Sequence, residues 1–117
     1  MVITFVFRPG QPLLISPDPA LVQRGDQVTW VIGYGGPEGF QFRRLLYWTV
    51  YFQSGNPFSP SPKLELTWHP DRLHPTASAE ISSPGAERPG DYKYGIRSHL
   101  IASHEVQSDD DPYLIVR

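Results

Sequence analysis

The sequence predicts an all-β protein of 117 residues that folds as a single β-sandwich. Short segments in which apolar and polar residues alternate recur along the chain, each bounded by turn residues, and this spacing is typical of sandwiches. The chain holds 10 Gly and 13 Pro, which leaves no room for long helices. Its hydrophobic content of 39% suffices for one packed core, so we expect one domain over residues 1–117.

Three short strands are expected in the first third of the chain. Residues 2–7, 13–16 and 27–32 alternate in the manner of strands, and Gly, Pro or Ser residues stand between them. Residues 33–39 contain four glycines and one proline, which supply few side chains to a sheet. We therefore expect a loop at residues 33–39, and loops of this kind carry function more often than strands do.

The most apolar stretch of the chain is residues 45–52, which we expect to form a central strand. Alternate residues of this strand would face the core, and its two tyrosines would face outward beneath a covering loop. Two functional interpretations of this stretch also stay open, because exposed apolar patches are often functional. One is a subunit interface formed by Tyr47, Trp48 and Tyr51, and the other is an aromatic surface that binds a ligand.

The second half of the chain predicts further short strands. The expected strands span residues 63–69, 77–83, 91–97 and 113–117. Residues 54–62 are a loop rich in Pro and Ser, and the prolines between residues 69 and 75 allow at most one helical turn. We expect His69 and His74, in that segment, to be ordinary surface histidines. Residues 98–111 show no sustained apolar period and are expected to be a long loop.

Two segments together resemble a known family. Residues 24–31 read Arg-Gly-Asp-Gln-Val-Thr-Trp-Val and resemble the Gly-Asp-x-Val-x-Trp entry to the third strand of cupredoxins. Residues 88–94 read Arg-Pro-Gly-Asp-Tyr-Lys-Tyr and resemble their Pro-Gly-x-Tyr-x-Tyr strand, which leads into the copper-binding loop. Residues 111–116 look like the last strand of that fold. The resemblance implies a Greek-key, cupredoxin-like sandwich, and an immunoglobulin-like sandwich is the alternative.

The resemblance also implies where copper ligands would lie, and two of them are missing here. A type 1 copper site needs two imidazoles and a thiolate, but Ile96 occupies the cysteine position and the chain has no cysteine. His99 falls at the position of a ligand histidine, and His104 falls at that of the axial methionine. The other histidine should follow Trp30 closely, yet the first histidine in the chain is His69. Composition therefore excludes electron transfer through type 1 copper.

We therefore expect a non-catalytic, cupredoxin-like binding or interaction module that uses no cofactor. If the fold is right, its working surface is the end where residues 33–39 and 98–111 meet. The expected ligand-binding residues are Tyr34, Phe40, His99 and His104. We expect no enzymatic activity, because the sequence contains no Gly-x-Ser-x-Gly elbow, no His-Glu-x-x-His pair and no phosphate-binding loop.

Two alternative functions stay open. His99 and His104 lie near Glu105 and the acidic run 109–111, and imidazoles with carboxylates suit zinc or non-blue copper. The second alternative is a homo-oligomeric structural protein that assembles through residues 45–52. In that case an exposed edge of the strand would pair across a two-fold axis.

Charge and hydropathy narrow the expected partners and compartment. The chain carries 10 Lys+Arg against 12 Asp+Glu, a net charge of −2, which is not the basic footprint of a nucleic-acid binder. It has no apolar run of the roughly 18 residues that a membrane span requires. We expect a protein partner or self-association, with a homodimer as one form. The lack of cysteine and of a basic leader before residues 2–7 fits the cytoplasm.

Overall fold

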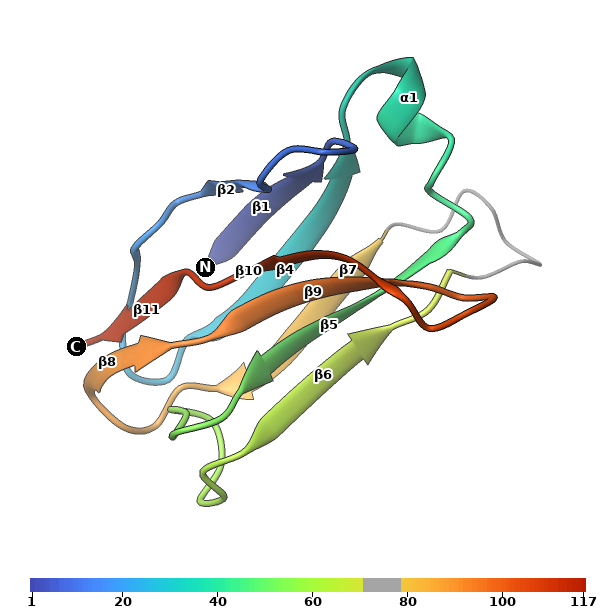
Figure 1. Ribbon diagram of the computed structural model, residues 1–117. Coiled ribbons are helices and arrows are strands. Elements are labelled where there is room, and N and C mark those ends of the chain that lie inside the picture. Colours follow the sequence, from blue (N-terminus) through green and yellow to red (C-terminus); the bar gives the residue numbers. More distant parts are fainter. Residues whose placement is uncertain (71–78) are drawn as a thin grey trace.

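The computed structural model describes residues 1–70 and 79–117. Residues 71–78 lie outside the described residues, and with them His74, most of the expected helical turn and the start of the expected strand at 77–83. Strands are the main regular element of the described residues, and they form sheets that pack as a sandwich (Figure 1). The all-β prediction is confirmed. Within the same residues, no helix has the length and apolar character needed to span a membrane.

The first layer of the sandwich is a four-stranded sheet in the order β2-β1-β4-β7. The strand β1 (Val2–Phe7) pairs antiparallel with β2 (Leu14–Ser16) and parallel with β4 (Gln27–Tyr34). The strand β7 (Glu80–Gly85) pairs antiparallel with β4 at the other edge. Alternate residues of β1 and β4 are buried, as their period-2 patterns predict.

The second layer is a four-stranded sheet in the order β10-β9-β5-β6. The strand β5 (Leu46–Phe52) lies between β9 (Gly95–Leu100) and β6 (Leu64–Trp68), antiparallel to both. The strand β10 (Val106–Asp110) forms the edge beyond β9. Every second residue of β5 is buried, which confirms the predicted central strand.

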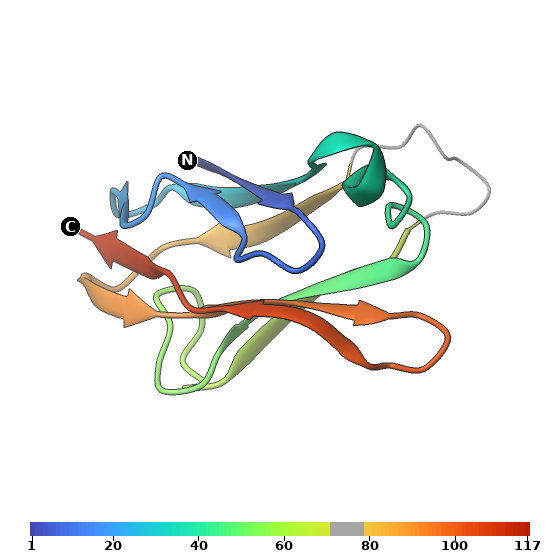
Figure 2. The ribbon, with the colours of Figure 1, turned by 45° about the horizontal axis from the view of Figure 1, so that its top comes forward.

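A third, three-stranded sheet closes one end of the sandwich, in the order β3-β11-β8. Its central strand β11 (Tyr113–Val116) runs parallel to β3 (Ala20–Val22) and antiparallel to β8 (Gly90–Lys93). Figure 2 shows this sheet at the end of the molecule that holds the C-terminus, whereas the helix α1 (Gly36–Phe40) lies at the opposite end. Surfaces near α1 and near β8 are therefore separate.

Aromatic side chains dominate the core between the layers. Trp30 and Trp48 are both fully buried, and each indole N–H donates a hydrogen bond to a tyrosine hydroxyl. The Trp30 Nε1 atom lies 3.2 Å from the Tyr94 hydroxyl oxygen, and the Trp48 Nε1 atom lies 3.1 Å from that of Tyr34. A buried indole N–H without an acceptor destabilises a fold, so both tyrosines act as structural partners.

Several predicted strand boundaries are wrong. Residues 98–111 form most of the β9–β10 hairpin instead of a loop, because pairing with β9 stabilises an edge strand that has little apolar character of its own. The expected single strand at 91–97 divides into β8 and β9, which belong to different sheets. The expected loop at 33–39 contains the end of β4 and most of α1, where Pro37 suits the first helical turn.

The interface expected at residues 45–52 is wrong in two respects. Because β5 pairs with β6 on one side and β9 on the other, it has no free edge to offer a second molecule. Trp48 is fully buried in the core and reaches no surface. Only Tyr47 and Tyr51 of the expected interface face outward. Arg97 of β9 contacts Tyr51, and Tyr47 is partly covered by His99 of β9 together with side chains just after β6 and in the β9–β10 turn.

Candidate functional site

The structure gives Tyr34 and Phe40 separate environments. The Tyr34 hydroxyl accepts the hydrogen bond from Trp48 Nε1, and burial raises the pKa of Tyr34 above its ordinary value. Tyr34 therefore has a structural role as the acceptor for a buried indole. Phe40, at the end of α1, is 53% exposed, and the Arg43 guanidinium lies 3.8 Å from the centre of its ring.

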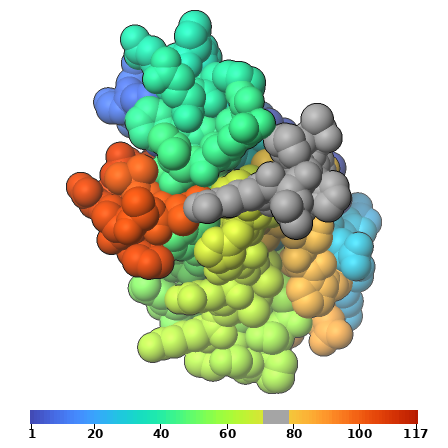
Figure 3. All heavy atoms as spheres, turned by 90° about the vertical axis from the view of Figure 1, so that its right-hand side faces the viewer, coloured from blue at the N-terminus to red at the C-terminus, as the bar shows by residue number. Residues whose placement is uncertain are grey.

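The two segments expected to form a working surface do approach each other. Figure 3 shows the segment that contains α1 beside the tip of the β9–β10 hairpin at this end of the molecule. The backbone N–H of Ile101 donates to the carbonyl of Leu45 over 2.9 Å, which ties the hairpin tip to the chain between α1 and β5. His99 and His104, however, make their side-chain contacts on the outer face of the second layer, around Tyr47.

Three histidines surround Tyr47. The His99 ring stacks on Tyr47 with centroids 4.7 Å apart, and the His69 ring stacks on it at 4.8 Å. His99 belongs to β9, on one side of β5, and His69 directly follows β6, on the other side. The Tyr47 hydroxyl oxygen lies 3.0 Å from His104 Nδ1. We call Tyr47, His69, His99 and His104 the histidine–tyrosine cluster. The sequence predicted His99 and His104 as neighbours but treated His69 as an ordinary surface residue.

The histidine–tyrosine cluster does not resemble a complete metal site. His99 Nδ1 lies 3.2 Å from the His104 carbonyl oxygen, and His104 Nδ1 lies against the Tyr47 hydroxyl, so one nitrogen of each ring already has a partner. Among the residues that the structure describes, no three or more His, Cys, Asp or Glu side chains are arranged to hold a metal ion.

Tyr51 is held in place by a second set of contacts on the same face. Its hydroxyl donates to the Asp109 carboxylate over 2.6 Å and accepts from Arg97 Nη2 over 3.2 Å. The Arg97 guanidinium also lies 4.5 Å from the centre of the Tyr51 ring and pairs with Asp109 at 3.1 Å. Burial first, and the Asp109 carboxylate second, raise the pKa of Tyr51. These contacts fix the orientation of the ring.

The Tyr51 ring lies across the strand β9 because the residue opposite it is a glycine. Tyr51 and Gly95 are direct cross-strand partners, and a methyl group at position 95 would overlap the ring of Tyr51. An aromatic side chain that covers a cross-strand glycine compensates for the missing side chain there. Gly95 therefore allows Tyr51 to reach the edge strand β10, where Asp109 lies.

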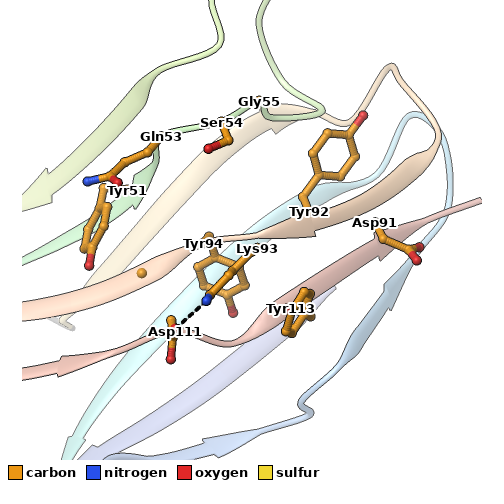
Figure 4. Close-up of a pocket in the computed structure, with 11 residues that line it drawn as sticks. Tyr51, Gln53, Ser54, Gly55, Asp91, Tyr92, Lys93, Tyr94, Asp111 and Tyr113 are labelled. Carbon is orange, nitrogen blue, oxygen red and sulfur yellow. Dashed lines mark ion pairs between the residues drawn. The ribbon is translucent and has the colours of Figure 1, made fainter.

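Two adjoining hollows run along this face. One, with a volume of about 320 Å³, lies over β5 between Tyr47 and Tyr51. The other, of about 530 Å³, continues past Tyr51 to Lys93 and Tyr113 (Figure 4). Both hollows are lined by Tyr51 and Gln53, so they adjoin at these two residues. We call the two hollows together the outer-face groove.

Among the residues that the structure describes, two Lys or Arg side chains line the outer-face groove, Lys93 and Arg97, and each is paired with a carboxylate. Lys93 Nζ lies 2.8 Å from Asp111, and Figure 4 shows this ion pair between the rings of Tyr51 and Tyr113. The Asp111 carboxylate raises the pKa of Lys93, and the Lys93 ammonium lowers the pKa of Asp111. Exposed pairs of this kind stabilise a fold little, so their main effect is to reduce the free charge in the groove.

Sequence reasoning placed Tyr47 and Tyr51 on the outer face but missed the charged residues of the groove. Cross-strand register decides which side chains meet, and the period-2 pattern of one strand carries no information about its partner. The signal that was available is the glycine after Tyr94, because a glycine inside a strand often marks a close approach by another group. No protein-family model and no curated protein matches this chain.

Proposed function

We propose that the protein is a non-catalytic binding module, built on a cupredoxin-like sandwich without a type 1 copper centre, whose ligand occupies the outer-face groove. The observation that carries the proposal is the groove itself, where tyrosine rings are held by ion pairs and hydrogen bonds before any ligand arrives. Groups fixed in a concave site cost little entropy on binding. The proposal moves the binding site away from Tyr34 and Phe40.

The cupredoxin-like part of the proposal has support from the positions of the resembling segments. Residues 24–31 lead into β4, residues 88–94 include β8, and residues 111–116 include β11, which pairs with β8. Ile96, at the position of a ligand cysteine in the resemblance, is fully buried in the core. An apolar, buried side chain there is consistent with a scaffold that has no copper centre.

A Greek-key connection is part of the same proposal. The Tyr92 hydroxyl donates to the carbonyl of Arg88, four residues upstream, over 2.9 Å. A tyrosine that bonds back to the backbone in this way is the tyrosine corner of Greek-key sandwiches. Immunoglobulin-like sandwiches share the feature, so it supports the Greek key without separating the two fold families.

A panel of oligosaccharides, short peptides and nucleotides, titrated into three proteins, tests the location of the binding site. The proteins are the wild type, Tyr51→Ala in the groove and Phe40→Ala beside α1, both at partly exposed positions. The proposal predicts that at least one class of ligand binds the wild type and Phe40→Ala alike and binds Tyr51→Ala more weakly. Binding that Phe40→Ala removes and Tyr51→Ala keeps would contradict it, as would a panel in which nothing binds.

Metal binding by His99 and His104 is a second candidate, favoured by the contact of both imidazoles with Tyr47. Since the described residues supply no third ligand, a second copy of the chain would complete the coordination. Titration of untagged protein with zinc and with copper tests this candidate. If His99 is a ligand, the wild type and the matched variant His69→Ala bind the metal, and His99→Ala does not. Equal binding by both variants would rule it out.

A further inference from the structure

The lining of the outer-face groove contains rings and polar groups without aliphatic side chains. In the parts of the chain that the structure describes, Tyr, His, Thr, Ser, Gln, Gly and charged residues line both hollows, and no Leu, Ile, Val or Met does. Surfaces that bind apolar peptides or lipid chains have apolar cores. A ligand that matches this lining presents C–H faces to the tyrosines and many hydroxyl groups to the polar side chains.

The charges of the groove favour a neutral ligand. Lys93 and Arg97 each pair with an aspartate, and Glu65 and Asp91 are further, exposed carboxylates of the lining. Exposed carboxylates repel anionic ligands such as phosphates or acidic polymers. They accept hydrogen bonds from hydroxyl groups, as the side chains of Thr49 and Gln53 also do.

The groove lies on the face of a sheet, and this position favours a sugar over a peptide strand as its ligand. A peptide that extends a sheet needs an edge with free backbone groups, but β5 is hydrogen-bonded on both sides beneath the groove. A ligand there must bind through side chains alone. From Tyr47 to Gln53 the strand extends roughly 20 Å, at about 3.3 Å per residue, so the groove is longer than a single sugar ring needs.

We propose that the outer-face groove binds a neutral oligosaccharide, because it juxtaposes the fixed ring of Tyr51 and the exposed ring of Tyr113 with hydroxyl, amide and carboxylate groups. The inference rests on the proposed function and adds the chemical class of its ligand. The ring faces of the sugar pack on Tyr51 and Tyr113, and its hydroxyls bond to Thr49, Gln53 and Asp91. Because Asp109 and Arg97 already hold the Tyr51 ring, binding orders few side chains.

Isothermal titration calorimetry with defined probes tests the inference. The neutral probes are cellohexaose, xylohexaose and hexa-N-acetylchitohexaose; a heparin hexasaccharide and a polar hexapeptide are the comparators. At least one neutral probe binds, and Tyr51→Ala weakens it by about tenfold, which corresponds to the roughly 1.4 kcal/mol of one lost contact. Tyr113→Ala, at a position that is 48% exposed, also weakens binding of that neutral probe. The matched control Phe40→Ala stays within about twofold of the wild type.

Each other outcome overturns a stated part of the account. If no neutral probe binds, or if Tyr51→Ala and Tyr113→Ala bind as tightly as the wild type, the oligosaccharide inference is wrong. If the peptide or the heparin fragment binds instead and Tyr51→Ala weakens it, the ligand class is wrong while the proposed groove stands. If only Phe40→Ala loses binding, the groove itself is wrong. Should Tyr51→Ala fail to fold, Tyr113→Ala and Gln53→Ala decide the result.

Discussion

Replacement of Gly95 by alanine tests the architecture of the groove directly. The added methyl group overlaps the Tyr51 ring, which is a side chain and can rotate away, so we expect the fold to survive while the ring leaves its position. That rotation breaks the hydrogen bond to Asp109 and removes the ring from beneath the Arg97 guanidinium. The variant therefore loses the fixed ring without losing the tyrosine.

The free-energy change follows from the contacts that are lost. A hydrogen bond to an exposed carboxylate contributes about 1 kcal/mol, and an exposed cation–π contact about 0.5–1 kcal/mol. Alanine in a strand gains roughly 0.5–1 kcal/mol over glycine, which offsets part of the loss. We therefore expect Gly95→Ala to destabilise the protein by about 1 kcal/mol. In the Tyr51→Ala variant no ring overlaps the added methyl group, so Gly95→Ala stabilises that variant by roughly 0.5 kcal/mol.

Urea unfolding followed by tryptophan fluorescence measures all four proteins of this double-mutant cycle. The account predicts a coupling energy between positions 51 and 95 of about 1.5 kcal/mol, well above the roughly 0.5 kcal/mol at which distant sites remain additive. Additive effects within that margin would show that Tyr51 does not lie over Gly95. A chain that does not fold when Gly95→Ala is introduced, yet folds with both substitutions, would support the same geometry.

Three further predictions concern the core, a buried turn and an ion pair. Tyr94→Phe leaves the buried Trp30 indole N–H without its acceptor and lowers the free energy of unfolding by about 1–3 kcal/mol in urea denaturation. Asn56→Ala removes the buried amide that bonds four groups in its own turn, and a Tm lowered by several degrees is expected. Because Lys93 lowers the pKa of Asp111, their pair stabilises the fold above the ordinary aspartate pKa and is lost as the pH falls through the lowered value. An NMR titration of the carboxyl group should show this pKa rise in Lys93→Gln; an unchanged value would contradict the ion pair.

The sequence predicted the strands that have a buried face of their own. β1 and β6 alternate in the sequence and in burial, and β5 is an apolar run whose alternate residues are buried, so the local pattern already contains the information that the fold uses. β10 (Val106–Asp110) could not be predicted in this way, because it is polar after Val106, lies at a sheet edge and depends on pairing with β9. The three-residue strand β3 is too short for any period to appear.

The candidate site was harder to predict than the fold. His99 and His104 were expected to be neighbours from a resemblance, and the β9–β10 hairpin does bring them to one tyrosine. The outer-face groove depends instead on register, which sets Tyr51 opposite Gly95 and within reach of Asp109 on the next strand. No single segment of the sequence carries that information, because the three residues belong to three strands.

The most direct test of the central claim is an amide chemical-shift map of the isotope-labelled protein during titration with the tightest-binding neutral hexasaccharide. The account predicts that the largest shifts belong to the amides of Tyr51, Lys93 and Arg97, around the outer-face groove. Shifts confined to the helix α1 and the tip of the β9–β10 hairpin would contradict it, and would return the binding site to the end of the molecule that holds Phe40.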